Sequence, residues 1–192
     1  LDGTDTREVS ISNSAGDFLV STHGTDNTTH GHIKLFESGI FSVATGGTTE
    51  RLRIDSSGRI LKGIQTARGN FANNTSGVEF GFQIEGTSAI AAGLSIIRNS
   101  DDVNDGGIVL GKTRSTSNGG NDAVIAGDDL GTITFAGSDG TTLQFGAEIL
   151  AEVQSGIGTD DLPTDLIFKT NGGATSTAER LRIKSDGTIN IT

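Results

Sequence analysis

The pentapeptide ERLRI occurs twice in the chain, at residues 50–54 and 179–183. A stretch rich in Gly and Thr precedes each copy, and a turn sequence with Ser and Gly follows it. The copies start 129 residues apart, at Glu50 and Glu179. Solenoid repeats recur every 20 to 50 residues or so, which is much shorter. The repeat therefore indicates a duplicated module and not a continuous array.

Each copy predicts a β-hairpin. Side chains alternate along a strand, so Leu52 and Ile54 would lie on one face, and the two arginines between and before them on the other. The segments 55–58 and 184–187 end in glycine, which tolerates the positive φ that such a turn needs at its last position. The returning strands would begin at residues 59 and 188.

The remaining chain also has the pattern of strands. Apolar runs separated by Gly, Asn, Asp and Ser predict strands at 9–11, 18–21, 33–36, 41–44, 108–110 and 166–168. Alternation predicts another at 78–84, and six apolar residues at consecutive odd positions predict a long strand over 143–153. Leu150 breaks that alternation, and we interpret it as a contact with another chain. The fold class is therefore all-β.

Composition limits what this chain can bury. It has 29 glycines, one proline, no cysteine and only 33% hydrophobic residues. Without disulfides, a chain with so little core is expected to oligomerise. The net charge of -10 argues against nucleic-acid binding, and without 18 consecutive apolar residues no membrane insertion is expected.

Two modules are predicted, 1–64 and 66–192, each ending in an ERLRI hairpin. The boundary is placed in the polar stretch 65–77, and the second, larger module is expected to be β-sandwich-like. Three segments rich in Gly, Asn and Asp, at 99–107, 114–122 and 155–161, read as surface loops. Loops held by a rigid sheet are common recognition surfaces.

Two segments carry a resemblance to a known family. The runs GDDLGTITFAGSDGTTLQFGAEILAEV and FKTNGG…ERLRIKSDGTINIT resemble the shaft and head modules of bacteriophage tail fibres, especially those of marine phages. The resemblance covers 124–192 and, less closely, 41–62. In that family, ERLRI-x-S-x-G segments commonly precede a C-terminal intramolecular chaperone that cleaves itself off after trimerisation. No chaperone sequence follows Thr192, so the resemblance implies either a piece of a mature fibre or a chain made without the chaperone part.

The resemblance implies an intertwined homotrimeric β fibre in the virion. Its partners would be other virion or tail proteins and a host cell-surface glycan or outer-membrane receptor, and its role would be structural and adhesive. No enzymatic activity and no cofactor are expected. Two alternatives remain open. One is a glycan-depolymerising fibre with a carboxylate pair in an inter-chain groove, and the other is a purely structural head-fibre or tail-connector component.

The histidines offer a candidate metal site. His30 and His32 would project from one face of an extended segment, so three chains meeting on an axis would supply six nitrogens. Some phage fibre tips, which this motif resembles, hold iron with repeated His-x-His motifs, whereas this chain has the motif once. The alternative is a solvated turn. Elemental analysis by X-ray fluorescence distinguishes the two.

Other polar clusters have plainer explanations. Residues 119–130 resemble one imperfect copy of a calcium-binding nonapeptide, but such sites need stacked repeats, so an ordinary turn is the expectation. The histidines lie within residues 23–32, and no nucleophile-elbow sequence occurs, so no catalytic residue is predicted. The ERLRI arginines are predicted to pair with carboxylates of adjacent chains, with binding of an anionic glycan as the alternative.

Overall fold

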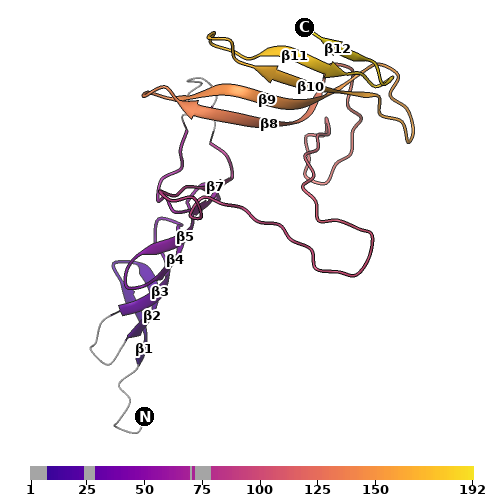
Figure 1. Cartoon of the computed structure of the whole chain (residues 1–192). Coiled ribbons are helices and arrows are strands. Elements are labelled where there is room, and N and C mark those ends of the chain that lie inside the picture. Colours follow the sequence, from indigo (N-terminus) through magenta and orange to yellow (C-terminus); the bar gives the residue numbers. More distant parts are fainter. Residues whose placement is uncertain (1–7, 24–28, 70, 72–78) are drawn as a thin grey trace. The chain divides into compact units, whose positions relative to one another are not determined.

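The computed structural model describes residues 8–23, 29–69, 71 and 79–192. Its described residues form strands and no helix, which confirms the predicted all-β class (Figure 1). No helix long and apolar enough to cross a membrane occurs in this part of the chain. The chain divides into two compact units, of which the second runs from Ile96 to Thr192. Each unit contains one sheet.

The first unit is a seven-stranded sheet whose strands follow one another in chain order. All neighbours are antiparallel except the last pair, which is parallel. This confirms the strands predicted between residues 9 and 44. The strands are β1 (Glu8–Ser14), β2 (Asp17–His23), β3 (Thr29–Leu35), β4 (Phe41–Thr45), β5 (Glu50–Ile54), β6 (Ile60–Lys62) and β7 (Phe82–Ile84).

The division between the units differs from the predicted modules. Residues 79–95 were assigned to the second module, but they belong to the first unit. The reason is that β7 pairs with β6, and the Gln83 side chain exchanges hydrogen bonds with the backbone of Arg68. Arg68 also forms an ion pair with Glu85. Pairing after the polar stretch therefore returns the chain to the first sheet.

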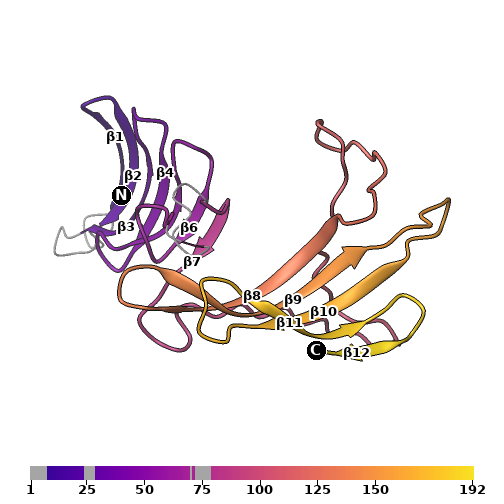
Figure 2. The ribbon, with the colours of Figure 1, turned by 90° about the horizontal axis from the view of Figure 1, so that it is seen from above.

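The second unit contains a five-stranded antiparallel meander in the order β12-β11-β10-β9-β8 (Figure 2). The long strand predicted over 143–153 has those bounds. A β-sandwich-like module was predicted, whereas the described residues of one chain form a single-layer sheet here. The strands are β8 (Asp129–Ser138), β9 (Leu143–Val153), β10 (Thr164–Thr170), β11 (Ala178–Ile183) and β12 (Ile189–Ile191).

Both predicted hairpin turns form in the same way. The N–H of Gly58 donates to the carbonyl of Asp55 at 2.9 Å, and the N–H of Gly187 donates to that of Lys184 at 2.9 Å. The two glycines have φ values of 81° and 85°, in the left-handed region that favours glycine. The turn chemistry in the sequence was therefore sufficient to predict both hairpins.

One predicted strand is absent. Residues 108–110 belong to no ladder, although Ile-Val-Leu has high β-propensity. A strand needs a neighbour for its backbone hydrogen bonds, and no described segment of the same chain lies beside this one as a ladder partner. The prediction is therefore wrong for the single chain.

The buried core is small and does not follow the odd-numbered face of β9. Leu150 is buried on the opposite face, beside Ile167, so its interpretation as an inter-chain contact is wrong. Val153 is also buried, whereas Ile149 and Ala151 are only half-buried. Which face of β9 is covered was therefore not predictable from its alternation.

Candidate functional site

The two ERLRI segments contain the same β-bulge. In β5, Leu52 pairs with Val43 and Glu50 with Ala44, which leaves Arg51 without an opposite residue. In β11, residues 181 and 179 pair with 168 and 169, which leaves Arg180 extra in the same way. A bulge of this kind re-aims the side chains around it.

The bulge lets glutamate and arginine meet within the motif. Residues three apart on a regular strand point to opposite faces, but one extra residue brings them to the same face. The Arg53 fork contacts Glu50 at 2.6 and 2.8 Å. The Arg182 fork contacts Glu179 at 3.0 and 2.8 Å. The ERLRI repeat is therefore a self-contained bidentate ion pair on a bulged strand.

These contacts correct the prediction for the arginines. Arg53 and Arg182 were expected to pair with other chains, but both pair with carboxylates of their own chain, so the prediction is wrong for both. Each bulged arginine donates a hydrogen bond from its Nε to a threonine hydroxyl of the same chain. Arg51 donates to Thr45 at 3.2 Å, and Arg180 donates to Thr170 of β10 at 3.1 Å. Alternation alone could not foresee the bulge.

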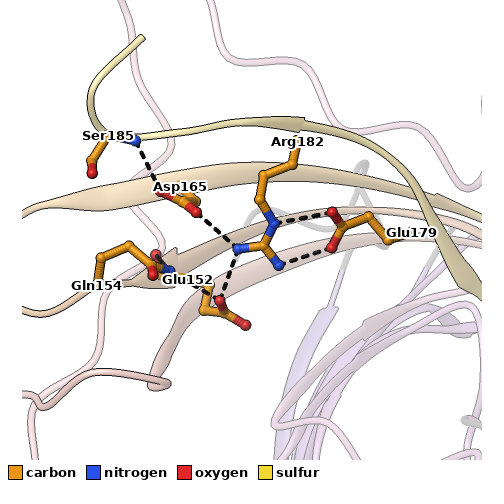
Figure 3. A network of polar contacts seen from close by, with 6 residues as sticks. All are labelled: Glu152, Gln154, Asp165, Glu179, Arg182 and Ser185. Atoms are coloured by element: carbon orange, nitrogen blue, oxygen red, sulfur yellow. Dashed lines mark hydrogen bonds and ion pairs between the residues drawn. The ribbon is translucent and has the colours of Figure 1, made fainter. Parts of the chain in front are cut away.

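The second copy extends its ion pair into a larger network (Figure 3). Nη1 of Arg182 contacts Asp165 Oδ2 at 2.8 Å and Glu152 Oε1 at 3.0 Å. The other oxygen of Asp165 accepts the backbone N–H of Ser185 at 2.8 Å. The Asp165 residue is only 2% exposed, so this carboxylate depends on its two donors.

Burial and pairing act in opposite directions on Asp165. Burial would raise the pKa of its carboxyl, but Arg182 and the Ser185 N–H outweigh burial and lower the pKa. Hydrogen bonding to Arg182 likewise lowers the pKa of Glu179. The surrounding carboxylates, Glu179 first, raise the pKa of Arg182. Asp165, Glu179 and Arg182 are therefore ionised at neutral pH.

This network is poorly suited to acid–base hydrolysis of a glycan. A glycosidase pairs a carboxylate with a carboxylic acid that keeps its proton because its pKa is raised. Here the pKa values of Asp165 and Glu179 are lowered, and both contact Arg182. The first copy lacks the equivalent aspartate, and there Arg53 lies 5.7 Å from the centre of the Phe36 ring. The chemistry of the cluster is therefore that of a structural clamp.

The candidate metal ligands lie in β3. The register between β2 and β3 shifts at their position, because Thr22 pairs with Gly31 and His23 with Thr29, which leaves His30 extra. The alternation that placed His30 and His32 on one face is therefore interrupted. Within one chain, the described residues contain no group of three or more His, Cys, Asp or Glu side chains placed to hold a metal ion. The three-chain site stays a prediction.

In residues 119–130, the segment compared with a calcium site, the Asp128 carboxylate binds two cationic side chains. Asp128 accepts from Lys112 Nζ at 2.6 Å and from Arg114 Nε at 2.7 Å, and also from the N–H of Ile125. These bonds, that with Arg114 first, lower the pKa of Asp128. The carboxylate, which is almost fully buried, fixes the base of the predicted loop 114–122. It is therefore an anchor for this loop.

The predicted loop 99–107 has a similar centre. The Asp102 carboxylate accepts hydrogen bonds from both Nη atoms of Arg98 at 2.5 Å and from the backbone N–H of Asn104 at 2.9 Å. Hydrogen bonding to Arg98 is the main reason that the pKa of Asp102 is lowered. Sequence reasoning identified both loops but neither anchor, because many aspartates are available and the fold selects which one meets an arginine.

Each sheet has an apolar face that its own chain leaves largely uncovered. Residues paired across strands point to the same side of a sheet, so the register defines these faces. Val9 and Ile11 are 69% and 70% exposed, and Phe135 and Ile191 are 57% and 85% exposed. The first apolar face comprises Val9, Ile11, Phe18, Val20, Ile33, Leu35, Phe41, Val43, Leu52, Ile54, Ile60 and Phe82. The second apolar face comprises Ile133, Phe135, Ile149, Leu166, Phe168, Leu181, Ile183, Ile189 and Ile191.

Comparison with solved structures identifies this architecture in phage fibres. The carboxy-terminal domain of the bacteriophage T5 L-shaped tail fibre matches with a TM-score of 0.59 and 15% sequence identity, over 97% of this chain and 78% of that chain. The same domain with its intra-molecular chaperone domain matches with a TM-score of 0.55 and 14% identity, over 97% of this chain and 54% of the other. No protein-family model matches the chain, and no curated protein matches its sequence. The likeness shows that this chain has the fold of a tail-fibre domain.

Proposed function

We propose that this chain is a segment of a phage tail fibre, assembles as a homotrimer in the virion and contributes to attachment to the host cell. The observation that carries the proposal is the pair of apolar faces, on sheets with the fold of a tail-fibre domain. Single-layer sheets with one bare apolar face are unfavourable in water, so each needs a second layer. Other copies of the chain are the partners always present at the required stoichiometry.

A threefold arrangement uses both faces in the same way. Three copies of a sheet can direct their apolar faces toward one axis and form a closed prism, which leaves the polar faces and loops outside. His32 lies on the polar face of the first sheet, opposite Ser21 and Ala44. In this arrangement its imidazole would point away from the axis, which argues against the six-nitrogen metal site.

The outward loops are the candidate attachment surface. The loops 99–107 and 114–122 are anchored by Asp102 and Asp128, so they present fixed shapes. Three copies of each would bind a surface glycan or an outer-membrane protein with an effective concentration that multiplies weak contacts. We infer a role without turnover, and the lowered pKa values of Asp165 and Glu179 beside Arg182 support it.

Light scattering of the purified chain, before and after treatment with detergent, tests the assembly. We expect a mass three times 19.7 kDa that persists in detergent. The mass of one chain, or of two, would refute the trimer. Binding of the fluorescently labelled protein to a panel of bacterial cells tests attachment. Saturable binding supports it, whereas release of reducing ends from purified surface polysaccharide would favour the depolymerising alternative.

A further inference from the structure

Residues 96–113 form a segment without secondary structure, which we call the arm. All of its residues are described, and no backbone–backbone hydrogen bond joins them to one another or to the rest of the described chain. Figure 1 shows the arm as a long trace without arrows. Most backbone groups of folded proteins have a partner, and loops of this length without secondary structure are uncommon in compact domains. Side chains bond the backbone of Asn104 only, so both ends of the arm have donors and acceptors that no other described residue uses.

The two ends of the arm carry the side chains of a strand, with the predicted loop 99–107 between them. Ile96 and Ile97 at one end are 52% and 77% exposed. At the other end, Ile108, Val109 and Leu110 are 69%, 93% and 50% exposed. Both ends are thus suited to a β-ladder that the described part of the single chain does not provide.

The arm is nevertheless held at defined points of its own unit. Lys112 is fixed by its ion pair with Asp128 at 2.6 Å. Leu110 passes over β8 so closely that a Cβ added at Gly131 would lie 2.5 Å from the Leu110 Cβ. An apolar groove lies between the arm residues Ile108 and Leu110 and the strands β8 to β10. Such anchoring reduces the conformational entropy lost when the arm docks.

A free strand edge is available in the same unit. β8 is the last strand of its sheet and pairs only with β9 among the described strands. It has ten residues, and apart from its ladder with β9, no backbone hydrogen bond joins residues 130–137 to the described chain. A long, exposed edge of this kind is an aggregation hazard that natural proteins cover.

We propose that the arm of one copy adds as a strand to the β8 edge of a neighbouring copy. The inference rests on the proposed trimer and specifies how its chains are linked. The arm does not serve its own β8 edge, because Leu110 lies over the apolar side of the sheet at Gly131, in the groove with Ile133 and Leu166. Arm-to-edge contacts are head-to-tail, and such contacts close into a ring when each chain is rotated by one third of a turn. The apolar faces then form the centre of the ring, and the arms cover the β8 edges between neighbouring copies.

Amide hydrogen exchange of the assembled full-length protein tests this pairing without a mutation. The amides of 96–97 and 108–113 have no backbone acceptor among the described residues of their own chain, so protection of these amides in the trimer indicates another chain. We expect about half of these amides, and the outward amides of β8, to exchange roughly 100-fold or more slowly than unprotected amides. Unprotected exchange of the arm in a protein with trimer mass would overturn the arm pairing and leave the trimer intact. A single-chain mass would overturn both.

Crosslinking identifies the chain that supplies the partner. A photoreactive phenylalanine derivative replaces Val109 in a protein assembled from a mixture of ¹⁵N-labelled and unlabelled chains. We expect crosslinks from position 109 to peptides of β8 that join labelled to unlabelled chains. The matched control carries the same group at the exposed Asn118, in the loop 114–122, and gives no crosslink to β8. Crosslinks from position 109 only within one chain would overturn the proposal.

A proline substitution gives an independent result. Val109→Pro removes an N–H that has no backbone partner among the described residues, so the described fold of the single chain loses no hydrogen bond. We expect this variant to lose protection across the arm and to dissociate in detergent, whereas Val109→Thr keeps both properties. Equal protection and detergent resistance in the two variants would contradict the inter-chain ladder.

Discussion

Replacing Arg182 by methionine tests the clamp of the second sheet. Methionine keeps much of the side-chain volume but removes the charge and all donors. The substitution leaves Asp165, whose side chain is 3% exposed, with one backbone donor, and it also leaves Glu152 and Glu179 without their cation. Breaking a buried ion pair costs about 3–5 kcal/mol. Because the Arg182 side chain is 20% exposed, we expect the lower end, about 3 kcal/mol.

The first copy of the motif supplies a matched control. Arg53→Met removes a fork of the same geometry, but only Glu50 loses its partner. A hydrogen-bonded charge pair of this kind contributes about 1.5–3 kcal/mol, and we expect the lower value here. For a chain of this length, 3 kcal/mol corresponds to a decrease in Tm of about 6–12 °C. Thermal and urea unfolding at equal chain concentration measure both variants.

The pH dependence separates lost charge pairing from lost packing. In the native protein the pKa of Asp165 is lowered, so its contribution to stability is complete above the ordinary value near 4 and is lost as pH falls through the folded-state pKa. In Arg182→Met, burial without the guanidinium would raise that pKa. Acid then protonates Asp165 in the variant and removes the cost of its buried, unpaired charge. The difference in stability between the two proteins should therefore shrink from pH 7 to pH 4. A difference that is independent of pH, or equal losses in the two variants, would refute the reasoning.

Two further substitutions test the first sheet. Gly63→Ala should destabilise it by more than about 2 kcal/mol, because φ is 83° and the new Cβ would overlap the carbonyl of Glu85. Gly58→Ala, at a φ of 81° with nothing within 4 Å, should cost only about 1 kcal/mol, and urea midpoints that coincide would contradict this. Ile54→Glu places a charge on the first apolar face and should reduce the mass by light scattering to that of one chain. Glutamate at the exposed turn residue Ser56 should leave the mass unchanged, and an unchanged mass for both would show that this face is not buried by assembly.

Local signals predicted most of the strands and both hairpins. The alternation over 143–153 predicted β9 with its bounds, because period 2 continues there for eleven residues. The turn residues around Gly58 and Gly187 predicted where the chain reverses, since these turns depend on nearby residues alone. The structure confirms these elements.

Features that depend on pairing between distant strands were not predictable. The bulge at Arg51 is defined by the register of β5 against β4, and only this register brings Glu50 and Arg53 to the same face. Asp165 lies 17 residues from Arg182 in sequence and meets it because β10 pairs with β11. Nothing in the sequence distinguishes Asp165 from the other acidic residues.

The sequence by itself determined that the chain forms strands and tight turns and that it has too few apolar residues for a large core. It also determined that one hairpin type occurs twice. These properties follow from backbone stereochemistry and composition, which act over a few residues. Only the tertiary structure decided which face of each sheet stays uncovered and which carboxylates surround Arg182. It also decided that the arm has no ladder partner among the described segments of its own chain. These outcomes depend on strand register, because a shift by one residue exchanges the two faces of a strand and changes every contact across it.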